Sequence, residues 1–136
     1  MLRFGKPPYL ECSSRGDRRF SAFYARPSIA GGLSIEEAYQ AAKVFNGPSG
    51  EQVTGLSWRV AKGRLCLNQK AVRKYYTYLW RCYIRENPAL LSVLHGASGL
   101  SDMFGQSDHA CQAEELWKIR NAKTSGRRVT PLTLRP

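Results

Sequence analysis

A short stretch that begins at Ser34 combines a strong helix signal with side chains that could do chemistry. Glu36, Gln40 and Lys43 are spaced at i, i+4 and i+7, so a helix would place a carboxylate, an amide and an amine on one face. Tyr39 falls at the edge of that face, and the helix dipole favours the ionised form of Glu36 in the first turn. An ionised carboxylate held beside hydrogen-bonding groups can stabilise a developing positive charge or activate water. The alternative is an ordinary solvated helix face with a polar i, i+4 pair.

The same stretch carries the signals that would position those groups. Ser34 followed three residues later by Glu37 is a capping box, which satisfies free amides at a helix start. We therefore predict a helix over residues 34–45. Apolar residues at helical spacing give this helix a core face: Ile35, Ala38, Ala42 and Phe45.

The charge of the chain is strongly positive and unevenly distributed. The sequence has 21 lysines and arginines against 10 aspartates and glutamates, a formal net charge of +11. The stretch 52–85 contains no acid and eight basic residues: Arg59, Lys62, Arg64, Lys70, Arg73, Lys74, Arg81 and Arg85. No acid follows Glu115 either. Such zones imply a positive surface that attracts the phosphates of a nucleotide or a nucleic acid, the alternative being charge that serves solubility alone.

The cysteines, histidines and apolar residues indicate the setting of the protein. The four cysteines, at positions 12, 66, 82 and 111, form no CxxC pair and no metal-ligand spacing with His95 or His109. We expect free thiols in a reducing compartment, no metal and no cofactor. The N-terminus lacks the apolar core of a signal peptide and no stretch could span a membrane, so we expect a cytoplasmic protein.

The remaining patterns predict a mainly α-helical fold, a single compact domain with little or no β-sheet. Residues 1–19 would be an N-terminal segment of the same domain, residues 20–121 its body, and residues 122–136 a basic, flexible tail. We expect these elements in order: a short strand at 9–12, a strand or extended segment at 20–26, helices at 56–63, 69–86 and 89–95, a loop at 97–107, and a last helix from 107 or 108 to 121.

Individual residues follow from these elements. Asn68 would cap the long helix, and Asn87-Pro88 would start the next one. Core positions of the long helix would be Val72, Tyr75, Leu79 and either Cys82 or Tyr83. The last helix would turn Ala113, Leu116 and Trp117 inward. Three aromatic residues could be ordinary core residues: Phe20, Phe23 and Tyr24.

Several segments, taken in order, resemble the NADAR family of N-glycosidases over roughly residues 20–121. The family pattern F-S-N-F-Y is similar to residues 20–24, and E-H-Y-Y-Q-A-x-K is similar to residues 36–43. Further similar segments are Ala61-Lys62-Gly63-Arg64, Asn87-Pro88-Ala89-Leu90, the aromatic-glycine pair Phe104-Gly105, and Leu116-Trp117-Lys118-Ile119-Arg120. The chain departs from the pattern at Glu37-Ala38, where the family has His-Tyr, and at Phe104, where it has Trp.

The resemblance implies a NADAR-type helical domain that hydrolyses an N-glycosidic bond in a nucleotide-like substrate. ADP-ribosylated guanine or another ribosylated phosphate metabolite is the implied substrate. The basic zones add a variant, in which they place a nucleic-acid strand over the site and the target nucleoside lies within that polymer. Glu36 matches the family glutamate, and would stabilise the oxocarbenium-like sugar or activate water. Asp102 would protonate the leaving base, although an aspartate in this loop could equally be a turn former.

Substrate-binding roles follow for the other matched and neighbouring residues. Gln40 and Lys43 would hold ribose hydroxyls or a phosphate. Arg64 and Arg19 would bind phosphate oxygens, with a helix C-terminus as the alternative role of Arg64. The residues that could stack on the base are Tyr39, Trp58 and Phe104, the last followed by Gly105. Core packing is the alternative for Trp58 and Phe104.

Two other functions fit the same residues. A non-catalytic module could bind nucleic acid or a nucleotide through the basic region 59–85. An inactive member of the family could sequester a nucleotide. Partners would then be a small nucleotide-like molecule or a nucleic acid, with no membrane, and the oligomeric state is left open.

Overall fold

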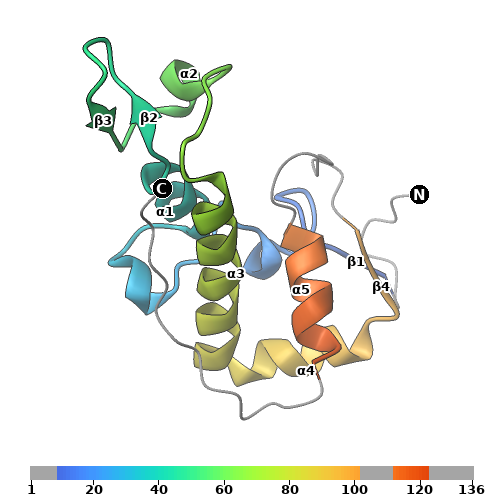
Figure 1. Ribbon diagram of the computed structural model, residues 1–136. Helices are drawn as coiled ribbons and strands as arrows, with labels where there is room; N and C mark the ends of the chain where they lie inside the picture. The colour runs from blue at the N-terminus through green and yellow to red at the C-terminus, as the bar shows by residue number, and fades with distance from the viewer. Residues whose placement is uncertain (1–8, 102–111, 123–136) are drawn as a thin grey trace.

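The computed structural model describes residues 9–101 and 112–122, and the helices in these ranges dominate the fold. They are α1 (Ile35–Ala41), α2 (Trp58–Ala61), α3 (Gln69–Glu86), α4 (Pro88–Gly96) and α5 (Gln112–Arg120). Figure 1 shows α3 at the centre, with α1 behind its upper end, α4 across its lower end and α5 beside it. The prediction of a mainly α-helical fold is confirmed for this part of the chain.

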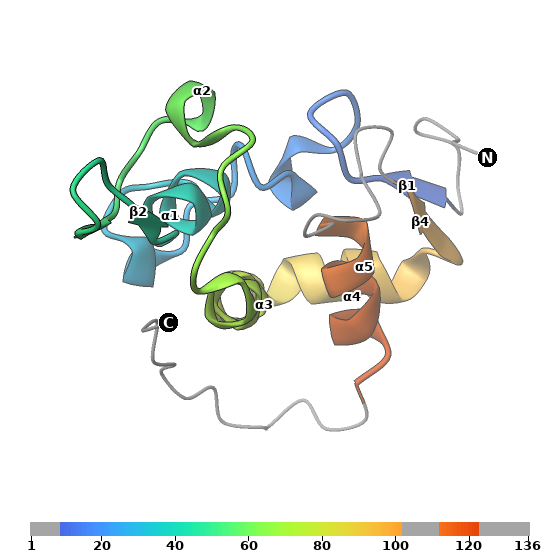
Figure 2. The ribbon, with the colours of Figure 1, turned by 45° about the horizontal axis from the view of Figure 1, so that its top comes forward.

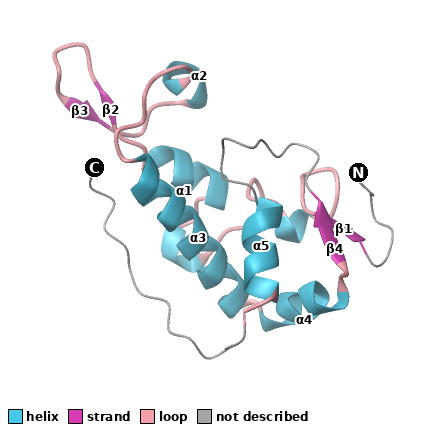
Figure 3. Cartoon of the chain, turned by 45° about the vertical axis from the view of Figure 1, so that its right-hand side comes forward, coloured by secondary structure: helices cyan, strands magenta, loops and turns pink. Residues whose placement is uncertain are grey.

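Two small sheets flank the helices. Strand β1 (Tyr9–Glu11) pairs in parallel with β4 (Gly99–Ser101), and β2 (Phe45–Asn46) pairs antiparallel with β3 (Gln52–Val53). Figure 3 shows them at opposite ends of the helical body. The strand expected at 9–12 is present as β1. Strand β4 lies in the stretch 97–107 that was expected to be a loop. It was missed because its pairing partner, β1, lies about 90 residues earlier, so no local sequence signal marks it.

The segment between residues 18 and 30 is not the strand expected at 20–26. It contains two 3-10 helices, η1 (Arg18–Phe20) and η2 (Ser28–Ala30), and a turn in which the amide of Ala25 donates to the carbonyl of Ser21 at 2.8 Å. Phe20 is fully buried. Phe23 and Tyr24 are 57% and 47% exposed, so the prediction that they are core residues is wrong.

Helix α3 has the bounds expected from its periodicity, but its buried face is displaced. Val72 and Leu79 are buried as predicted, whereas Tyr75, Cys82 and Tyr83 are only partly buried. The other fully packed positions are Tyr76, Trp80 and Ile84. The reason is that α3 packs against α1 and η2 as well as α4 and α5, so more than one side of the helix meets the core.

The ends of the shorter helices follow local signals in part. Helix α1 ends at Ala41, four residues earlier than predicted, and Phe45 is buried as part of β2. Helix α2 is shorter than the expected 56–63. Pro88 is the first residue of α4, as predicted. In α5, Ala113 and Leu116 are buried, but Trp117 is 37% exposed, so its predicted inward orientation is wrong.

Asn68 was expected to cap α3, but its side chain makes no capping hydrogen bond. It instead joins the start of α3 to the end of α1. Its Oδ1 accepts from the amide of Val44 at 2.9 Å, and its Nδ2 donates to the carbonyl of Ala42 at 3.1 Å. The side chain is almost completely buried. These bonds hold the chain just after α1 against the start of α3.

We expect Asn68→Ala to lower the free energy of unfolding by about 2–4 kcal/mol, because one buried and one partly buried backbone group lose their partners. Urea unfolding followed by circular dichroism would measure it. Asn46→Ala removes an exposed asparagine from β2 and should change stability by less than about 0.5 kcal/mol. Equal losses in the two variants would contradict a joining role for Asn68.

One hydrophobic core connects most elements. Its larger buried side chains are Phe20, Ile35, Tyr39, Val72, Tyr76, Leu79, Trp80, Ile84, Leu90, Leu94 and Leu116. Cys12, Cys66 and Cys82 are free thiols. None of the helices in the described ranges is long and apolar enough to cross a bilayer. In the same ranges, no three His, Cys, Asp or Glu side chains gather as a metal site would require.

Candidate active site

The first turn of α1 is fixed to the turn before it, and this fixes Glu36. The amides of Ile35 and Glu36 donate to the carbonyls of Ala25 and Ala22, both at 2.9 Å. The predicted capping box is present: Ser34 Oγ accepts from the Glu37 amide at 3.1 Å, and Glu37 Oε1 accepts from the Ser34 amide at 2.8 Å. The backbone amides at the helix start therefore have partners within the protein and are not available to a ligand. The role of this turn is to position Glu36.

Glu37 is the structural carboxylate of this turn. The hydrogen bond from the Ser34 amide lowers the pKa of Glu37, and Arg26, 3.3 Å away, lowers it further. Folding lowers the pKa of this carboxylate, so its ionised form stabilises the folded protein at pH values above 4.5, the ordinary pKa of a glutamate. That stabilisation is lost as the pH falls through the lower folded value.

We expect the melting temperature of Glu37→Gln to fall less steeply than that of the wild type between about pH 5 and about pH 3. Glutamine keeps the capping contact but does not titrate. Differential scanning calorimetry at several pH values would test this. Parallel curves for the two proteins would contradict the role given to Glu37.

Glu36 and Gln40 form a hydrogen-bonded pair at the surface of α1. Both side chains are partly buried, and Gln40 Nε2 donates to Glu36 Oε2 at 2.7 Å. Within the described residues, no donor is bound to Glu36 Oε1. The pair thus holds a carboxylate in one orientation and leaves one of its oxygens available to a substrate or a water.

Tyr39 lies beneath this pair and contacts α3. Its side chain is 3% exposed, its ring meets the edge of Tyr76 with centroids 5.0 Å apart, and Lys43 Nζ lies 4.7 Å from its ring centre. These contacts occupy the ring, so it is not free to stack on a base as predicted. Tyr39 could act only through its hydroxyl.

The Tyr39 hydroxyl is a buried donor close to charges of both signs. Burial raises the pKa of Tyr39; Gln69 and the positive charge of Arg73 oppose the rise, and the negative charge of Glu36 adds to it. The phenol therefore stays protonated at neutral pH. Its oxygen has no partner of hydrogen-bond geometry in the described part of the chain, although Gln69 is near it. A bound polar atom would satisfy this donor.

These residues define the α1–α3 site: Glu36, Tyr39 and Gln40 from α1, Lys43 just after its end, and Gln69 and Arg73 from α3. The predicted helical face is assembled only in part: Glu36 and Gln40 pair on α1, whereas α1 ends at Ala41 and Lys43, in the connection that follows, lies over the ring of Tyr39. Gln69 and Arg73 were not singled out as site residues, because only the packing of α3 on α1 brings them to Tyr39.

A further residue missed from the sequence is Phe23. The carbonyl of the preceding Ala22 binds the Glu36 amide, and the Phe23 side chain is 57% exposed. Arg18 lies over the ring of the neighbouring Tyr24 at 4.7 Å. An exposed aromatic ring next to the backbone of the candidate carboxylate is suited to stacking. Three aromatic residues in five positions, 20–24, were the available signal.

Arg19, which was predicted to bind phosphate, forms an ion pair within the protein. Its Nη2 and Nε donate to the two carboxylate oxygens of Asp17 at 2.6 and 3.0 Å. These hydrogen bonds lower the pKa of Asp17 and raise that of Arg19. One edge of the guanidinium is therefore bound within the protein, and the phosphate-binding role stays a prediction.

The remaining predicted residues are only partly placed. Arg64 is exposed on the connection between α2 and α3. Trp58 begins α2, and its side chain lies outside the described part of the structure, as do Asp102, Phe104, Gly105 and the tail 123–136. The roles of Asp102, Phe104 and Gly105 stay predictions.

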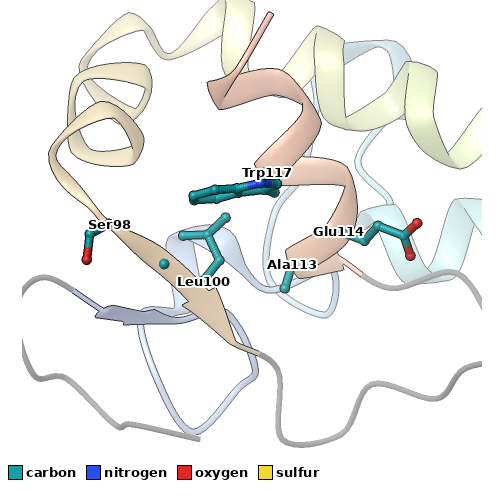
Figure 4. A pocket seen from close by; sticks show the side chains of 6 residues that line it. Ser98, Leu100, Ala113, Glu114 and Trp117 are labelled. Atoms are coloured by element: carbon teal, nitrogen blue, oxygen red, sulfur yellow. The ribbon is translucent and has the colours of Figure 1, made fainter. Parts of the chain in front are cut away.

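A separate shallow hollow of about 330 Å³ lies between β4 and α5 (Figure 4). Its lining is mostly apolar: Ser98, Gly99, Leu100, Ala113, Glu114 and Trp117. The Trp117 indole lies over Leu100, and the Glu114 carboxylate points away from it. Among the described residues, none of the predicted site residues lines this hollow, and its described lining offers no convergent polar groups for chemistry.

Comparison of the chain with family models, curated proteins and solved structures gave no match. The NADAR resemblance accordingly rests on the segments quoted above. The case for a function rests on those segments and on the geometry of the α1–α3 site.

Proposed function

We propose that the protein is an N-glycosidase that hydrolyses a nucleotide-like substrate at the α1–α3 site, with Glu36 as its catalytic carboxylate. The observation that carries the proposal is the orientation of Glu36. Gln40 binds one carboxylate oxygen at 2.7 Å, and the capping turn fixes the backbone. The other oxygen is left for the reaction.

Hydrolysis of an N-glycosidic bond breaks the bond between the anomeric carbon and the base nitrogen and forms a bond from that carbon to a water oxygen. The sugar becomes oxocarbenium-like in the transition state. Glu36 would face this positive charge and accept the proton of the attacking water. The departing base takes a proton from an acid, the role that the family resemblance gives to Asp102.

The positive groups around Glu36 suit a substrate that carries phosphate. Lys43 lies over the ring of Tyr39, and Arg73 is exposed on α3 near its hydroxyl. Both cations lie near Tyr39, and neither forms an ion pair with Glu36 in the described part of the chain. They would bind phosphate, while Phe23 would stack on the base.

ADP-ribosylated guanine or a related ribosylated phosphate metabolite fits this combination, as the resemblance implies. The test is release of a free base, read by mass spectrometry, when the purified protein meets NAD, ADP-ribose, ADP-ribosylated guanine nucleotides and ADP-ribosylated DNA. We expect release from at least one of the guanine substrates. No release from any of them would overturn the proposal.

A further inference from the structure

Four positive side chains form a stripe along α3, which we call the α3 stripe: Lys70, Lys74, Arg81 and Arg85. Their spacing of four, seven and four residues keeps them on one face of a helix with 3.6 residues per turn. All four are exposed. At 1.5 Å per residue the stripe is about 22 Å long.

Most of the described neighbours of α3 pack on its other sides, and α5 reaches one edge of the stripe, where Glu115 Oε1 accepts from the Thr77 hydroxyl at 2.8 Å. Contacts join α3 to α1, η2, α4 and α5. Figure 2 looks almost along α3 and shows α1 on one side and α4 and α5 on the other, with no described element below it. Because its four side chains are exposed, the stripe is open to a partner as far as the described residues extend.

The positive charge at three of the four stripe positions is not neutralised by an ion pair with a described residue. These three are Lys70, Lys74 and Arg81. The single acid of α3, Glu86, accepts from the amide of Ser28 at 3.0 Å and from its hydroxyl. Like charges one turn apart destabilise a helix. A surface that keeps two such pairs is suited to an extended anion.

Tyr78 fills the gap in the middle of the stripe. It follows Lys74 by four residues and precedes Arg81 by three, so it lies on the same face. Its ring is partly exposed, and Tyr75 lies behind it with the ring centroids 6.5 Å apart and the planes inclined by 21°. Cations flanking a stacked aromatic pair are the features that bind the phosphates and bases of a single strand.

We propose that the α3 stripe binds single-stranded nucleic acid, with phosphates on the four cations and a base on Tyr78. This proposal goes beyond the N-glycosidase activity and does not depend on it. The large exposed apolar side chains of the described residues lie elsewhere, at Phe23, Tyr24, Ile29, Leu33, Val60, Leu65 and Trp117. A membrane surface would need such side chains beside the cations, so nucleic acid is the favoured partner.

The test measures anisotropy of fluorescein-labelled 20-nucleotide oligo(dT), oligo(U) and a 20-base-pair duplex at several salt concentrations. The Lys74→Gln/Arg81→Gln variant removes two stripe charges. Arg15→Gln/Arg18→Gln removes two charges from other exposed positions and is the matched control. Loss of two phosphate contacts should lower the magnitude of the slope of log K against log salt by about 1.4, at about 0.7 for each contact. The control should keep the wild-type slope.

Tyr78 provides a second measurement. Tyr78→Ala should weaken single-strand binding by about tenfold, whereas Tyr78→Phe, which keeps the ring, should bind like the wild type. Glu36→Gln should also bind like the wild type, which separates binding from turnover. Three results would overturn the proposal: binding that is absent or salt-independent, equal losses in the stripe and control variants, or a preference for the duplex. If the protein bound vesicles of phosphatidylserine and phosphatidylcholine but none of the nucleic acids, the stripe would be assigned to a membrane surface instead.

Discussion

Glu36→Gln protein is expected to release the base at least about 100-fold more slowly than the wild type, with little change in KM. Glutamine can still accept from Gln40, so the local geometry should persist. What is lost is the negative charge, which acts on the sugar only as positive charge develops in the transition state. Initial rates at several concentrations of an ADP-ribosylated guanine nucleotide would measure both constants.

Glu37→Gln is the matched control for this experiment, because it makes the same change one residue along the same helix turn. Glu37 is bound to Ser34 and Arg26 and faces the cap, so its variant should keep close to the wild-type rate. If Glu37→Gln were as slow as Glu36→Gln, the loss would be structural. If Glu36→Gln kept full activity, another group would be the catalytic carboxylate.

Trp80→Ala is expected to lower the free energy of unfolding by about 3–5 kcal/mol, through lost burial and the cavity left behind. Trp80 is completely buried, and its ring packs edge-to-face with that of Tyr83, with the ring centroids 5.7 Å apart. Domains of this kind are typically stable by about 5–15 kcal/mol, so the variant would be close to unfolding at 37 °C. Urea unfolding followed by circular dichroism measures the loss.

Two further variants sharpen this prediction. Trp80 Nε1 has no hydrogen-bond partner in the described part of the chain, so Trp80→Phe removes an unsatisfied donor along with some volume. Its cost should be less than half that of Trp80→Ala. Trp117→Ala changes a partly exposed tryptophan and should cost about 1 kcal/mol or less. A similar loss in all three variants would contradict the burial argument.

Features encoded by neighbouring residues were predictable from the sequence. The capping box at Ser34 and the limits of α3 follow from residues three to four apart, and the structure has both. The pairing of Glu36 with Gln40 follows from the same helical period, whereas Lys43 lies beyond the end of α1. These signals need no knowledge of the rest of the fold.

Features that depend on distant residues were not predictable. The buried face of α3 was misassigned because its aromatic residues surround the helix, and only packing selects Tyr76 and Trp80 over Tyr75. The pairing of β1 with β4 and the approach of Arg73 to Tyr39 likewise arise from tertiary contacts. Arg19 is a different case, since Asp17 two residues earlier could have indicated an internal partner.

The Ala22 peptide has a consequence for how the protein becomes active during synthesis. Its carbonyl accepts from the Glu36 amide at 2.9 Å, and its own amide donates to the buried Gln112 side chain at 2.6 Å. The residue that positions Glu36 is therefore held by a side chain made 90 residues later. A nascent chain that has α1 but not yet α5 lacks this support, so the site would mature only after α5 has been synthesised.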